Sequence, residues 1–67
     1  MDIVKQGNLS LEKNDYISAI DYFTEALKQD ATNSELWRKR GFCFYQLDYI
    51  VHSIMDSENA LKLDQSK

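Results

Sequence analysis

The sequence contains no proline, two glycines and one cysteine. Because helix breakers are scarce, the composition favours a domain built from helices. The single cysteine, Cys43, excludes a disulfide framework within one chain and is typical of a reducing compartment. No signal peptide is recognisable, and the longest apolar run, Phe42–Tyr45, is far shorter than the roughly 20 residues that span a bilayer. We therefore expect a cytoplasmic or nuclear protein without a membrane partner.

Basic charge is also scarce, with eight Lys and Arg against eleven Asp and Glu and a net charge of −3. This balance argues against a nucleic-acid partner, whose phosphates require a basic surface. There is no glycine-rich phosphate loop and no nucleophile–base pair at a recognisable spacing. One cysteine and one histidine cannot make a zinc site. The sequence therefore predicts neither an enzyme nor a protein that carries a metal or another cofactor.

What the chain does have is a helical periodicity of apolar residues. Tyr16, Ile20, Phe23 and Leu27 lie four, three and four residues apart, which places them on one side of a helix. Similar stripes, separated by short connections, predict antiparallel neighbours in an all-α single domain of 67 residues. The expected helices cover about 3–12, 16–27, 36–47 and 49–63.

Polar residues mark where these helices should begin. Asp15 and Asp48 are suitable N-caps for the second and fourth helices, because a short side-chain oxygen accepts from free backbone N–H groups. Thr32 and Glu35 have the spacing of a capping box before the third helix. The predicted starts therefore follow these caps.

The chain also repeats itself. When it is shifted so that Gly7 falls on Gly41, it matches itself at seven identical positions, Ile20 with Ile54 among them. The Asp-Tyr-Ile sequence that begins at Asp15, however, recurs at Asp48, after 33 residues, whereas Gly7 and Gly41 are 34 residues apart. We therefore expect a turn one residue shorter in the second half, with Ile50 taking the buried position of Tyr16. Tyr49 is then expected to lie toward the turn.

A period of about 34 residues in helix–turn–helix units resembles the tetratricopeptide repeat (TPR) family. Trp37-x2-Arg40-Gly41-x2-Phe44 is similar to one family motif and Ala19-x3-Phe23 to another. The resemblance implies a fragment of a right-handed α-solenoid made of two repeats, about 1–33 and 34–67. It implies close helix approach at the glycines, and an Arg40 whose stem packs between repeats.

A narrower likeness is to cochaperone-type TPR domains, carried in part by Gly7-Asn8 and by Arg40-Gly41-Phe42-Cys43-Phe44. Such domains hold acidic C-terminal tails of heat-shock chaperones with a clamp of Lys, Asn, Asn, Lys and Arg. Asn8 matches the first asparagine of that clamp. Val4 stands in the place of its lysine, beside Lys5, and Lys39 stands in the place of the second asparagine. The last two clamp residues belong to a third repeat that this chain lacks.

In this fold the first helix of each pair lines a concave groove, so the resemblance also implies which side chains meet a ligand. Two cations and an amide on one face are suited to a peptide carboxylate, although consecutive charges can also be merely solvated. Phe42 and Tyr45 share a face, either as apolar anchors or as packing residues. Cys43 is expected to be a small buried residue. The groove candidates are Lys5, Asn8, Glu12, Glu35, Arg38, Lys39, Phe42, Tyr45 and Gln46.

Two functions remain open at this point. One is a protein–protein interaction module that binds a short peptide, such as the acidic tail of a chaperone. The other is a structural or self-associating fragment, because repeat arrays usually need about three repeats and a polar cap. The chain ends at Asp64–Lys67, directly after the fourth expected helix. In this second interpretation the open last helix, with Ile54, packs on another subunit, as in a homodimer, or on a missing capping helix.

Overall fold

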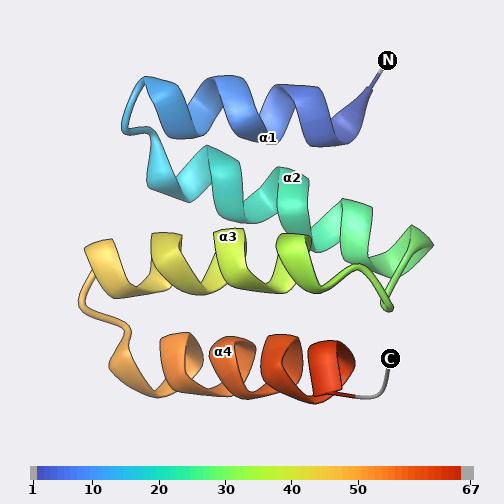
Figure 1. The fold of residues 1–67 in the computed structure, drawn as a ribbon. Helices are drawn as coiled ribbons and strands as arrows, with labels where there is room; N and C mark the ends of the chain where they lie inside the picture. The colour runs from blue at the N-terminus through green and yellow to red at the C-terminus, as the bar shows by residue number, and fades with distance from the viewer. Residues whose placement is uncertain (1, 66–67) are drawn as a thin grey trace.

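The computed structural model describes residues 2–65 as four α-helices, with no strand in that range. Each helix packs against its neighbour in the sequence and the directions alternate, so that α1 and α3 run the same way (Figure 1). The prediction of an all-α chain of two helical hairpins is confirmed. The helices are α1 (Ile3–Glu12), α2 (Tyr16–Gln29), α3 (Ser34–Gln46) and α4 (Ile50–Gln65).

The start of α2 agrees with its predicted cap, and the start of α3 does not. The Asp15 carboxylate accepts from the backbone N–H of Ser18 at 3.3 Å. At α3 the N-cap is Asn33, whose side chain accepts from the Glu35 N–H at 3.1 Å, so the prediction that used Thr32 is wrong. Asn33 has the extended backbone typical of an N-cap, with φ −84° and ψ 99°, and the Thr32 hydroxyl instead donates to Asp30.

The turn of the second hairpin corrects another prediction. Asp48 does not cap α4, because its φ is +67° and the helix begins two residues later, at Ile50. Asn14 has the same conformation in the first hairpin, with φ +59°. Asn and Asp are the residues other than glycine that enter this left-handed region most readily. The two turns are therefore equal in length, and the expected one-residue shortening is wrong.

The hydrogen bonds of the turns repeat at the same interval that separates Gly7 from Gly41. The Asp15 N–H donates to Ser10 O at 2.9 Å, and the Tyr49 N–H donates to Phe44 O at 2.8 Å. Tyr49 thus stands in the backbone place of Asp15, which means that the recurring Asp-Tyr-Ile is out of structural register.

The expected exchange of Tyr16 for Ile50 is half right. Both residues open their helices, and Tyr49 lies in the turn with 54% of its surface exposed, as predicted. Ile50, however, is 44% exposed rather than buried. The reason is that α3 covers Tyr16, whereas no described helix covers this side of α4.

The core lies where α1, α2 and α3 meet, and both glycines permit close approach of neighbouring helices. A Cβ added at Gly7 would stand 2.7 Å from Cε1 of the fully buried Phe23, and one at Gly41 would stand 3.1 Å from Cβ of Asp56. Both glycines therefore lie at a close contact with the second helix of their pair, as predicted, and the contact at Gly7 is the tighter one. The buried residues of this core are Ala19, Phe23, Ala26, Leu27, Leu36 and Cys43.

A buried polar cluster joins the two repeats. The guanidinium of Arg40 donates from Nε and Nη2 to the two oxygens of Asp56, both at 2.8 Å, and from Nη1 to Thr24 Oγ1 at 3.3 Å. It lies 5.0 Å from the ring centroid of Trp37 and 5.6 Å from that of Phe44. Asp56 is only 3% exposed. The expectation that Arg40 packs between repeats is confirmed, and the cluster connects α2, α3 and α4.

Trp37 also secures the connection between the repeats. Its indole Nε1 donates to the carbonyl of Ala31 at 2.8 Å, in the loop between α2 and α3. One face of the ring meets the Arg40 guanidinium, and the side chain is half-buried. Trp37 therefore links the loop to the Arg40 cluster.

Candidate functional site

A hydrogen bond between α1 and α3 defines the candidate site. Lys39 donates from Nζ to Asn8 Oδ1 at 2.8 Å, and the Lys39 side chain is 27% exposed. These residues stand 31 apart in the sequence, and the parallel course of α1 and α3 brings them together. Lys39 and Asn8, together with Lys5, Glu35 and Phe42 on the same two helices, are called the α1–α3 face below.

Glu35 modifies this face. Its carboxylate lies 3.0 Å from Lys39 Nζ, one helical turn away on α3. The hydrogen bond from Lys39, and the charge of that ammonium, hold the pKa of Glu35 below its usual range. The ammonium therefore already holds one carboxylate oxygen and one amide oxygen, which are two of the acceptor types that a peptide offers.

Lys5 adds a second cation beside this bond. It lies one helical turn before Asn8, is exposed, and makes no ion pair within residues 2–65. Glu12 and Gln46 are exposed at the last residues of α1 and α3. They therefore lie further along the same two helices, away from the Lys39–Asn8 bond.

The two aromatic candidates are both accessible. Phe42 is 47% exposed, and its ring meets that of Tyr16 edge-on at 6.1 Å between centroids. Tyr45 is 60% exposed, so its interpretation as a core residue is wrong. Phe42 thus packs against Tyr16 and still exposes about half of its surface, which suits an apolar contact with a ligand.

Arg38 is the groove candidate that the structure directs elsewhere. Its Nη1 donates to Asp64 Oδ2 on α4 at 2.6 Å, rather than joining Asn8 and Lys39. Neighbouring residues on a helix are about 100° apart, so Arg38 and Lys39 diverge. The three consecutive cations at 38–40 therefore serve three different contacts.

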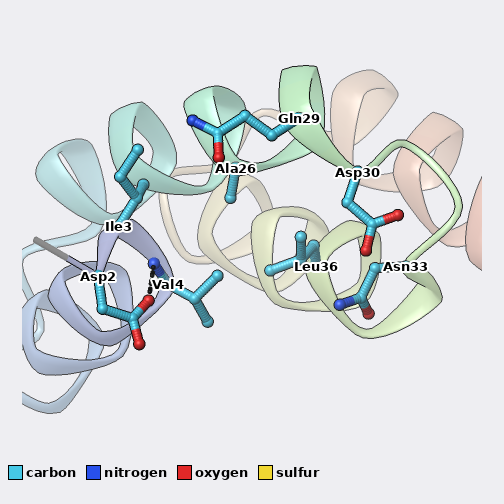
Figure 2. Close-up of a pocket in the computed structure, with 8 residues that line it drawn as sticks. All are labelled: Asp2, Ile3, Val4, Ala26, Gln29, Asp30, Asn33 and Leu36. Carbon is cyan, nitrogen blue, oxygen red and sulfur yellow. Dashed lines mark hydrogen bonds between the residues drawn. The ribbon is translucent and has the colours of Figure 1, made fainter.

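A cavity of about 290 Å³ at the start of α1 and α3 was not predicted. Figure 2 shows Asp2 and Asp30 on opposite sides of it, with Ala26 and Leu36 between them. The antiparallel α2 brings its last turn between the first turns of α1 and α3, a juxtaposition that periodicity alone does not reveal. We call it the end cavity, and its lining residues are Asp2, Ile3, Val4, Ala26, Gln29, Asp30, Asn33 and Leu36.

Cys43 is not a reactive site. The side chain is fully buried, as predicted, and burial raises the pKa of its thiol to about 11. The thiolate, which is the nucleophilic form, is therefore nearly absent at neutral pH.

In residues 2–65 no three His, Cys, Asp or Glu side chains gather as a metal site requires. None of the described helices combines the length and the apolar character that a membrane span needs.

Comparison with known proteins gives relatives of one kind. No family model matches the chain. The small glutamine-rich tetratricopeptide repeat-containing protein 2 of Saccharomyces cerevisiae is 32% identical over 65 residues, 97% of this chain and 19% of that protein. The heat shock protein sti1 homolog of Schizosaccharomyces pombe is 31% identical over 62 residues, 92% of this chain and 10% of that protein. The TPR repeat-containing protein YsoA of Bacillus subtilis is 33% identical over 60 residues, 90% of this chain and 18% of that protein.

The chain thus spans at most about a fifth of the length of these relatives. The matched region nevertheless covers nearly all of this chain, and two of the three relatives are named for the repeat. The structure adds two helical hairpins whose turns share one hydrogen-bond pattern and whose glycines meet the second helix of each pair. On this sequence and structural evidence, the chain belongs to the tetratricopeptide repeat family.

Proposed function

We propose that this chain is a non-catalytic module that holds a short peptide by a carboxylate on the α1–α3 face. Its tetratricopeptide relatives support the general class, a protein–protein interaction module. The observation that carries the finer proposal is the Lys39–Asn8 hydrogen bond between the two repeats. It sets a partly desolvated ammonium beside an amide, and charge-assisted bonds to a carboxylate are stronger in such a setting than in open water.

Glu35 supports a carboxylate as the ligand group. Lys39 already binds the carboxylate of Glu35, at 3.0 Å. The Glu35 side chain is 63% exposed. An exposed side chain is exchanged at little cost, because solvent screens a surface ion pair and the pair contributes little to stability. A peptide carboxylate can therefore replace Glu35 at Lys39, with Lys5 as a second cation and Phe42 as an apolar contact.

We propose the acidic C-terminal tail of a heat-shock chaperone as the ligand class. The heat shock name of one relative and the partial clamp, with Asn8 in place and Lys39 where the family has asparagine, support this choice. Val4 replaces the clamp lysine, so Lys5 has to supply that charge. We therefore expect a smaller set of contacts than a complete clamp makes.

The test compares a labelled acidic peptide that has a free C-terminal carboxylate with its amidated form. We expect about tenfold tighter binding of the free acid, because amidation removes the charge that Lys39 recognises. Lys39→Ala should abolish that preference, whereas Lys28→Ala, which removes an exposed lysine on α2, should preserve it. Fluorescence anisotropy titration measures both. Equal affinity of the two peptides for the wild-type chain contradicts the proposal.

Glu35→Gln supplies a reciprocal arm of the same titration. Glutamine retains the size of the side chain but not its charge, so the peptide no longer competes with a local carboxylate. The free-acid peptide should then bind a few times more tightly, by the scale of one exposed ion pair. Weaker binding to this variant would mean that Glu35 assists the ligand rather than occupying its place.

The exposed face of α4 supports a second function, self-association. Ile20 and Leu27 of α2 pack toward the core, whereas their counterparts in the second repeat, Ile54 and Leu61, are 53% and 59% exposed. Met55 beside them is 56% exposed. We propose that a second copy or a further helix covers this face. Contiguous apolar surfaces of this kind mark interaction sites.

Sedimentation equilibrium tests the version with a second copy. The apparent mass should rise with concentration in the wild-type chain, and Ile54→Lys should hold it at the monomer value, because a charge then enters the contact. A matched change on another exposed apolar residue, Ile17→Lys on α2, should leave association intact. A monomer at every concentration removes self-association and leaves only a further helix as the cover.

A further inference from the structure

We propose that the end cavity receives a lysine or arginine side chain of the same segment whose carboxylate binds the α1–α3 face. This inference rests on the proposed function and adds a second requirement on the ligand. It begins from a cavity of about 290 Å³ that the carboxylate site does not use. A volume of this size is near the lower end of ligand pockets and suits one side chain rather than a whole small molecule.

The inner wall of the end cavity is apolar. Ala26 and Leu36 are 5% and 3% exposed, and Ile3 and Val4 on α1 are half-buried. Such a wall matches the methylene stem of a long side chain, which gains by leaving water even when its end group stays hydrated. The wall alone does not select between a basic residue and a purely aliphatic one.

The rim selects the charge. Asp2 and Asp30 lie on opposite sides of the cavity (Figure 2), and neither forms an ion pair with a Lys or Arg of residues 2–65. Asp2 already accepts from the N–H groups of Val4 and Lys5 at the start of α1. Asp30 accepts a hydroxyl from Thr32, at the C-terminal end of α2, where the last carbonyls carry partial negative charge. A cation is therefore favoured on the Asp30 side of the cavity. On the other side, Asp2 and Asn33 cap the first turns of α1 and α3, whose N–H groups carry partial positive charge.

The position of the end cavity relates it to the carboxylate site. Val4 precedes Asn8 by four residues on α1, and Leu36 precedes Lys39 by three on α3. The two sites are thus about one helical turn apart, roughly 5.4 Å along the helix axis. An extended segment advances about 3.3 Å per residue and alternates its sides. The basic residue should therefore stand two positions from the residue that carries the carboxylate.

The experiment uses labelled peptides with a free C-terminal carboxylate in a neutral polar background. One series places lysine at the third residue from the C-terminus, counting the C-terminal residue as the first. Norleucine at the same position is the control, because it has a similar aliphatic chain without the charge. We expect lysine to bind about threefold more tightly than norleucine, the scale of a solvent-accessible ion pair. Lysine moved to the second residue from the end should lose the gain, because its side chain then points away.

Asp30→Asn tests the charge on the protein side. The asparagine oxygen can still accept from Thr32, so the helix end is retained while the charge is lost. The lysine advantage should vanish in Asp30→Asn and persist in Asp21→Asn, a matched change at an exposed position of α2. Equal affinity of lysine and norleucine peptides for the wild-type chain overturns the inference. An advantage that survives Asp30→Asn overturns it as well.

The peptides also separate this inference from the function on which it rests. If the free acids bind better than their amides but show no lysine preference, the carboxylate site stands and the end cavity has no such role. If neither the free-acid peptides nor the amidated peptides bind, both proposals are contradicted. Far-UV circular dichroism of each variant, compared with the wild-type chain, shows that the fold is the same in every titration.

Discussion

Replacing Asp56 with alanine is expected to lower the free energy of unfolding by about 3 kcal/mol, because removal of one partner leaves a buried charge uncompensated. Asp56 is 3% exposed and accepts two bonds of 2.8 Å from Arg40, whose own side chain is 18% exposed. After the change, Thr24 is the only remaining hydrogen-bond acceptor of that guanidinium among residues 2–65. Urea denaturation followed by far-UV circular dichroism measures the loss.

Two further variants show whether the loss comes from the buried charge. Arg40→Leu places there the residue that the family motif carries, and combined with Asp56→Ala it should recover much of the stability, since no charge is left unpaired. Glu25→Ala breaks the ion pair with Lys28, in which the Lys28 and Glu25 side chains are 67% and 56% exposed, and should cost less than about 1 kcal/mol. A double variant as unstable as Asp56→Ala contradicts the explanation.

Gly7→Ala is expected to destabilise the chain by about 1 to 2 kcal/mol, although alanine is the better helix former. The helix propensity gain is about 1 kcal/mol, but the new Cβ would lie 2.7 Å from Cε1 of Phe23. Phe23 is fully buried, so its ring cannot move aside without disturbing the core, and overpacking of this kind typically costs about 1 to 3 kcal/mol. The same denaturation experiment measures the change.

A second substitution at the contact provides the control for Gly7→Ala. Phe23→Leu removes ring atoms that the new Cβ would meet, so the double variant should be more stable than the sum of the two single effects predicts. If Gly7→Ala instead raises the stability, helix propensity outweighs packing and the contact is less rigid than its geometry indicates.

Most of the fold could be predicted because its determinants are local or periodic. The apolar stripe of α2 and the internal repeat indicated four helices in two hairpins, and Gly7 and Gly41 indicated where helices approach. One error arose where two local signals competed, and another where burial depended on a neighbouring helix. Asp48 suits both an N-cap and a left-handed turn, and only the backbone register decides for the turn. Ile50 has the right register, but its burial depends on what covers α4, which hydrophobicity cannot reveal.

The candidate site was less predictable, because its parts come from different helices. Lys39 and Asn8 were named on a resemblance, but their hydrogen bond requires the parallel placement of α1 and α3. Arg38 looks equivalent to Lys39 in the sequence, and one residue of helical rotation directs it to Asp64. The end cavity combines residues from three separate turns, so no single segment carries a signal for it.

Trp37 has an optical consequence. It is the single tryptophan of the chain, so all tryptophan fluorescence comes from one position. That position is the junction of the repeats, where the indole bonds to Ala31 and meets Arg40. Separation of the hairpins should therefore change the emission strongly, whereas a ligand that contacts only Lys39 and Asn8 should leave it almost constant. The same chain thus contains an internal reporter of repeat docking that does not respond directly to peptide binding.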